Sequence, residues 1–118
     1  IYTVKNINKR RILSFDFNYN SYRLPIDQIL YVEKVQDNQK CILTMEDGKK
    51  YEIMTSLGDI KKKLGPSFFQ SHKSCLVNVE QIKKVNYADN TITFQNNESV
   101  YLLSNRNKKG LREYVGSY

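Results

Sequence analysis

The chain has 118 residues, of which 40% are hydrophobic and 12% aromatic, and it carries a net charge of +7. This length suits one domain that can bury a core without metal ions or disulfides, and the composition excludes a disordered chain. No apolar run in the sequence is long enough for a membrane-spanning helix, and the polar, basic start does not resemble a signal peptide.

Short strands are predicted throughout the first half, because apolar and polar residues alternate there. The predicted strands cover residues 11–17, 28–35, 40–45 and 49–54. Alternation in the second of them places Ile29, Tyr31 and Glu33 on one face. Turns are predicted at residues 18–21, 37–38 and 46–48, and Leu24-Pro25 is predicted to open a loop.

A short helix is predicted after residue 55, where the period of the apolar residues changes. Leu57, Ile60 and Leu64 recur at helical spacing behind a capping serine, Ser56. The pair Gly65-Pro66 ends the element. Three consecutive lysines, at residues 61–63, either contact phosphate or form the solvated face of this helix.

The second half predicts further β structure and a final helix. A helical turn at residues 78–81 is followed by strands at 82–87, 91–95 and 99–103, with turns at 89–90 and 96–97. Ser104 is predicted to cap the last helix, whose apolar side has Leu111, Tyr114 and Val115. The pattern gives seven or eight strands and two short helices, which is an all-β or β-dominated α+β domain.

The distribution of charge indicates the class of binding partner, and the cysteines indicate the cellular compartment. Residues 60–118 hold ten Lys and Arg against four Asp and Glu, a net charge of +6, whereas residues 1–59 hold nine against eight. Such an excess indicates an acidic partner, such as nucleic acid or an anionic membrane. Cys41 and Cys75 lie far apart in apolar runs, which predicts reduced core thiols in a cytoplasmic protein.

No set of residues predicts an active site. His72 is the one histidine of the sequence, and Cys75 has no second Cys/His pair with which to complete a metal site. The glycines are scattered, so no phosphate-binding loop is predicted, and the carboxylates are isolated. We therefore expect neither enzymatic activity nor a cofactor.

Two basic segments are better candidates for function. Lys73 stands where a polar stretch changes to a buried strand, and the run Asn105–Lys109 opens a helix, whose N-terminus favours phosphate. Arg can bind guanine O6 and N7, and Asn or Gln can pair with adenine. Alternatively, Arg106 and Lys108 only solubilise an exposed helix. Residue types alone leave an RNA-binding barrel and a protein-interaction module equally open.

Three segments in order resemble LytTR DNA-binding domains. Phe68-Phe69-Gln70-Ser71-His72-Lys73-Ser74, followed by Cys75-Leu76-Val77-Asn78 and Ile82, is similar to the family signature. Leu24-Pro25 with 29–33 resembles the first core strand of the family, and Ser104-Asn105-Arg106-Asn107 resembles the start of its last helix. The family has Arg where this chain has Gln70, which puts any contact made by that Arg in doubt.

The resemblance implies a mainly β, ten-stranded fold with two short helices that docks on double-stranded DNA through loops in the major groove. Lys73 and Arg106 are the expected base contacts, with Gln39 third, while His72 and Ser74 brace a loop or touch phosphate. Asn78 is expected to be structural. The full set of implied DNA-binding residues is Asn38, Gln39, Lys40, Gln70, His72, Lys73, Ser74, Ser104, Asn105, Arg106, Lys108 and Lys109, with Asp37 in the same loop as Asn38.

The resemblance also implies a biological setting. LytTR domains are output domains of response regulators of the AgrA, ComE and VirR types, and the VirR type is the expected one. Residues 1–10 are then the end of an interdomain linker, and residues 11–118 are the DNA-binding domain. The implied partners are tandem promoter repeats, a second copy on DNA, RNA polymerase and an upstream receiver domain, with no membrane.

Overall fold

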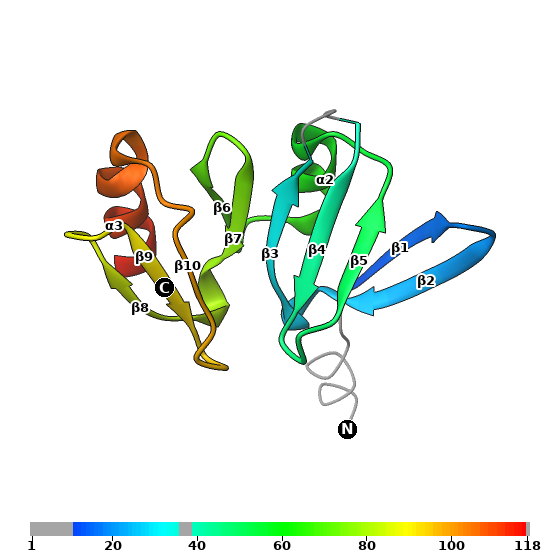
Figure 1. Cartoon of the computed structure of the whole chain (residues 1–118), viewed down its shortest axis with the longest axis horizontal. Coiled ribbons are helices and arrows are strands. Elements are labelled where there is room, and N and C mark those ends of the chain that lie inside the picture. Colours follow the sequence, from blue (N-terminus) through cyan, green and yellow to red (C-terminus); the bar gives the residue numbers. More distant parts are fainter. Residues whose placement is uncertain (1–10, 36–38, 118) are drawn as a thin grey trace, which may run out of the picture.

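The computed structural model describes residues 11–35 and 39–117 (Figure 1). Within them lie ten strands and two α-helices, which confirms the mainly β fold that the resemblance implies. The elements are β1 (Ile12–Phe17), β2 (Asn20–Pro25), η1 (Ile26–Gln28), β3 (Ile29–Lys34), β4 (Cys41–Met45), β5 (Lys50–Ile53), α2 (Leu57–Leu64), β6 (Phe68–His72), β7 (Cys75–Asn78), η2 (Val79–Gln81), β8 (Ile82–Asn86), β9 (Thr91–Phe94), β10 (Ser99–Val100), η3 (Asn105–Asn107) and α3 (Lys108–Gly116).

The main sheet is antiparallel and has the order β5-β4-β3-β7-β6. Its middle strands are buried on both faces, which explains why their sequences read as continuous apolar runs. The expectation that Ile29 and Tyr31 share a face is wrong. The register of β3 against β4 shifts between these residues, and this bulge sends Ile29 into one core cluster and Tyr31 into the other.

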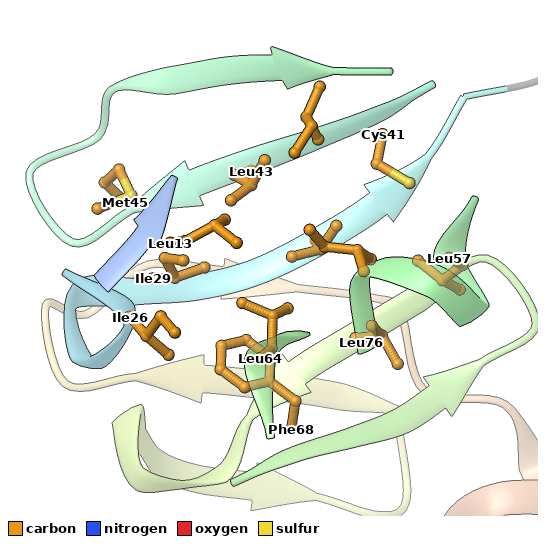
Figure 2. Packing of buried hydrophobic residues seen from close by; sticks show 13 residues of the cluster. Leu13, Ile26, Ile29, Cys41, Leu43, Met45, Leu57, Leu64, Phe68 and Leu76 are labelled. Carbon is orange, nitrogen blue, oxygen red and sulfur yellow. The ribbon is translucent and has the colours of Figure 1, made fainter. Parts of the chain in front are cut away.

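The first cluster lies between the main sheet and the elements β1, η1 and α2 (Figure 2). The predicted helix is confirmed: Ser56 Oγ accepts from the N–H of Asp59 at 3.1 Å, and Leu57, Ile60 and Leu64 are buried. Lysines 61–63 are all exposed on its outer side. Gly65 ends the helix at φ 90°. Leu64 and Phe68 belong to this cluster and lie next to each other in Figure 2.

The second cluster joins the other face of the main sheet to the β10-β9-β8 sheet and α3. Tyr31 stacks on Phe94 with ring centroids 5.5 Å apart. The predicted Asn turns are confirmed at Asn90 and Asn97, whose φ angles are 59° and 74°. Asn78 is structural, as expected: it is fully buried, and its Nδ2 donates to the backbone oxygen of Ile29 at 2.9 Å. These contacts fix the ends of β7 and β9 against β3.

Both cysteines are free and buried, as predicted for core thiols. Burial raises the pKa of the Cys75 thiol to about 12, and a hydrogen bond with Ser71 only partly opposes this. We expect Cys75 in the folded domain to resist an aromatic disulfide reagent at pH 8 and to react at once in denaturant. Because the folded-state pKa is raised, the thiol favours the fold at neutral pH, and this contribution falls as pH rises above 9.0. Rapid labelling of Cys75 in the native state at pH 8 would contradict this burial.

Candidate nucleic-acid interface

The β6–β7 hairpin carries most of the signature residues. Gln70 and Lys73 are exposed, and His72 and Ser74 are half-buried. The register shifts between Gln70 and His72, so the intervening Ser71 turns inward and is fully buried. The hairpin therefore presents a lysine at its turn, with polar side chains on either side of it.

Hydrogen bonds within the hairpin brace that turn. His72 Nδ1 accepts from the backbone N–H of Ser74 at 3.2 Å and lies 3.0 Å from the Ser74 hydroxyl oxygen. Because Nδ1 accepts, the proton of the neutral ring is on Nε2. Gln70 Nε2 donates to the backbone oxygen of Lys73 at 3.4 Å. Gln70 thus closes the turn at the position where the family pattern has Arg.

Ser71 joins this hairpin to the segment that leads into η3. Its hydroxyl donates to the backbone oxygen of Leu102 at 2.6 Å, and its own backbone oxygen accepts from the N–H of Ser104 at 2.9 Å. Around thirty residues of sequence separate these partners. The buried serine therefore brings the two predicted basic segments side by side.

A pocket of about 440 Å³ opens between the hairpin and η3. Among the residues that the structure describes, two cationic side chains, Lys73 and Arg106, and no carboxylate line it. Its lining residues are Gln70, His72, Lys73, Ser104, Arg106 and Asn107. Lys and Arg side chains only donate hydrogen bonds, so this pocket is suited to a ligand that offers acceptors or negative charge.

Ser104 does not cap the last helix as predicted. It precedes the 3-10 turn η3, and α3 begins only at Lys108, with Asn107 as its N-cap residue. The Ser104 hydroxyl instead accepts from Asn107 Nδ2 at 2.8 Å, and it lies 3.4 Å from the backbone oxygen of Ser71. The hydroxyl is thus engaged in attaching η3 to the hairpin.

The end of β3, which leads into the predicted loop before β4, adjoins the base of the hairpin turn. The N–H of Lys34 donates to the backbone oxygen of Ser74 at 2.8 Å. Gln39 is exposed, whereas Lys40 pairs with Glu52 at 3.5 Å. Asp37 and Asn38 lie outside the described residues. In Figure 1 the start of β4, the β6–β7 turn and η3 (orange) all lie at the upper end of the molecule.

The remaining predicted residues adjoin the pocket-lining residues Arg106 and Asn107 in the sequence. Asn105 is exposed next to Arg106, and Lys108 and Lys109 stand in the first turn of α3. Asn107 also lines the pocket; it lies in the predicted run Asn105–Lys109 but was not among the predicted DNA-binding residues. The sequence did not indicate Asn90, whose Nδ2 lies 3.1 Å from Asn105 Oδ1. Asn90 stands in a turn fifteen residues before Asn105, and no local pattern in that turn predicts a contact with Asn105.

Metal binding, histidine chemistry and membrane insertion are the alternatives to nucleic-acid binding in the part of the chain that the structure describes. No three His, Cys, Asp or Glu residues of that part could hold a metal ion. His72 contacts Ser74 within the hairpin turn, as described above. None of the described helices has the length and apolar character to cross a membrane.

A family model described as LytTr DNA-binding domain matches residues 19–116. This range includes all the residues that line the pocket. The chain belongs to the LytTR family. The resemblance predicted from the three segments is thereby confirmed, and DNA is the ligand class of such domains.

The fold of this LytTR domain is shared by a solved structure. The LytTr DNA-binding domain of a Bacillus cereus protein, described as a methyl-accepting/DNA response regulator, superposes with a TM-score of 0.73. The two sequences are 21% identical, and the match covers 92% of this chain and 99% of the other. A search of curated proteins gives no significant match.

Proposed function

We propose that this LytTR domain binds double-stranded promoter DNA in a sequence-specific manner and controls transcription as the output domain of a response regulator. The observation that carries the proposal is the pocket in which Lys73 and Arg106 meet from separate elements, with no carboxylate of residues 11–35 and 39–117 in its lining. The description of the Bacillus cereus domain as part of a response regulator supports the regulatory setting.

Lys73 and Arg106 are the proposed base-contacting residues. Both are exposed, both line the pocket, and neither can accept a hydrogen bond. The major-groove edge of guanine offers two acceptors, O6 and N7, which suit such donors. The half-site that this domain prefers should therefore contain guanine opposite the pocket.

The other predicted residues have supporting roles in this proposal. Because His72 Nδ1 accepts from Ser74, the proposal assigns the other ring nitrogen, Nε2–H, as the donor to phosphate. Gln39 adds a contact from the loop between β3 and β4, and Lys40 adds positive charge at the end of that loop. The groups proposed to touch the backbone are Gln70, Ser74, Ser104, Asn105, Lys108 and Lys109.

A wider assembly follows from the proposal. Two copies occupy tandem promoter repeats, and RNA polymerase is recruited beside them. An upstream receiver domain governs their pairing. The AgrA, ComE or VirR subtype stays a prediction, as does the division into a linker at 1–10 and a domain at 11–118.

Selection from random duplex DNA at near-physiological salt tests the proposal directly. We expect recovery of a short guanine-containing motif, repeated about one or two helical turns apart. The selected duplex should then outcompete single-stranded DNA and RNA of the same sequence. Preference for either single strand would favour a single-strand-binding module instead, and absence of any motif would contradict sequence-specific recognition.

Salt dependence should identify the backbone contacts. The logarithm of the binding constant is expected to fall with the logarithm of salt concentration, with a slope of about −0.9 for each phosphate contacted. Replacing Lys108 and Lys109 with Ala should make this slope shallower by up to about 1.8. The same double change at Lys61 and Lys62 on α2 is the matched control, expected to leave the slope unchanged. A flat salt response in the wild type would favour a protein-interaction module.

A further inference from the structure

The turn between β8 and β9 touches the segment that leads into η3. Asn90 stands in this turn at φ 59°. Its Nδ2 donates to the backbone oxygen of Leu103 at 2.7 Å and lies 3.1 Å from the Oδ1 of Asn105. These contacts join a residue outside the pocket to the neighbour of Arg106.

The two contacts determine how both side-chain amides are oriented. The backbone oxygen of Leu103 can only accept, so the group of Asn90 beside it must be the NH₂. That NH₂ can only donate, so Asn105 must face it with its oxygen. The Nδ2 of Asn105 is therefore on the opposite branch of its exposed side chain. Within residues 11–35 and 39–117 this Nδ2 donates to no group, so its donors can meet an acceptor outside the domain.

The segment before η3 has a second support on its other side. Ser71 of β6 donates to the backbone oxygen of Leu102, and its own backbone oxygen accepts from Ser104. Residues 102–104 are thus attached both to the hairpin that carries Lys73 and to the β8–β9 turn. Removing the Asn90 support would loosen η3 without removing an apolar core residue.

We propose that Asn90 is a positioning residue for DNA recognition by this domain. It turns the donor side of Asn105 toward the phosphate backbone, and it fixes η3 so that Arg106 meets the same base pairs as Lys73. This inference rests on the proposed function, since Asn90 matters to binding only if Asn105 and Arg106 contact DNA. Asn90 itself does not line the pocket.

Asn90→Gly isolates the side chain, because glycine adopts a positive φ without strain. Loss of its hydrogen bonds should weaken binding to the selected duplex about 3- to 10-fold, while binding to a scrambled duplex changes less than about twofold. Asn97→Gly is the matched control: Asn97 has φ 74°, and its Oδ1 accepts from Lys83 Nζ at 2.7 Å, away from η3. We expect Asn97→Gly to leave both affinities unchanged.

A second substitution at Asn90, and the same substitution in a protein that already lacks Asn105 and Arg106 side chains, distinguish a positioning role from a loss of stability. Asn90→Asp keeps the size and the turn preference of Asn but cannot donate, so it should weaken specific binding at least as much as Asn90→Gly. When Asn105 and Arg106 are both Ala, Asn90→Gly should have no further effect, because nothing is left to position. A merely structural residue would cost the same affinity in either background.

The possible results are distinct. Equal losses for Asn90→Gly and Asn97→Gly, or an undiminished loss in the double-Ala background, would overturn the positioning role alone. A wild-type domain that prefers no duplex sequence would overturn the proposed function itself, and the inference with it.

Discussion

Replacing Arg106 with Ala should weaken binding to the selected duplex by about 1–3 kcal/mol, which is the usual cost of losing one base contact. The side chain is exposed, lines the pocket and makes no hydrogen bond or ion pair within residues 11–35 and 39–117. The melting temperature should therefore stay nearly constant. Anisotropy titrations with duplexes altered one base pair at a time would measure the loss and show which position has lost discrimination.

Arg112→Ala provides the matched control for that experiment. Arg112 is also exposed, but it lies on α3 with its guanidinium 4.4 Å from the ring centre of Tyr87. Its removal deletes the same charge outside the pocket, so sequence preference should not change. Lys73→Ala should resemble Arg106→Ala. Unfolding of the Arg106 variant would instead identify this arginine as a structural residue.

Leu76→Ala should have the opposite profile, with a large loss of stability and no change in base preference below the melting temperature. Leu76 is fully buried in the cluster between the main sheet and α2. Truncating a buried leucine typically costs about 2–5 kcal/mol, through lost transfer energy and the cavity left behind. Urea unfolding followed by circular dichroism would give the difference in the free energy of unfolding.

Met54→Ala is the control for Leu76, because Met54 follows β5 and its side chain is 64% exposed. Truncation there should change the free energy of unfolding by less than about 0.5 kcal/mol. If Leu76→Ala were as mild as Met54→Ala, the packing of β7 against α2 would be looser than its complete burial indicates.

Local chemistry made some elements predictable and others not. A capping serine, three apolar residues at helical spacing and a terminal glycine define α2 without help from the rest of the fold. The faces of β3 could not be predicted, because its bulge depends on how it pairs with β4. Alternation also missed β2, in which no residue is fully buried, and β6, in which the bulge at Ser71 interrupts the pattern.

The residues of the candidate site stand out in the sequence, but their arrangement in space does not. Lys73 and Arg106 stand out as basic residues in polar segments, and the resemblance marks both of them. That they share one pocket depends on Ser71, whose partners lie around thirty residues later. The part played by Ser104 was missed for the same reason, since its hydroxyl serves a tertiary contact and does not cap the helix.

Neighbouring residues of β6 face opposite ways and have different roles. Phe68 and Ser71 face inward and hold the sheet and η3 together, while Gln70 faces outward next to the turn that carries Lys73. Arg106 likewise stands on η3, a turn in which no residue is fully buried. Exchanges at these outward positions would leave the interior intact. A duplicated copy of this domain could therefore acquire a new target site by a few surface substitutions, without passing through unfolded variants.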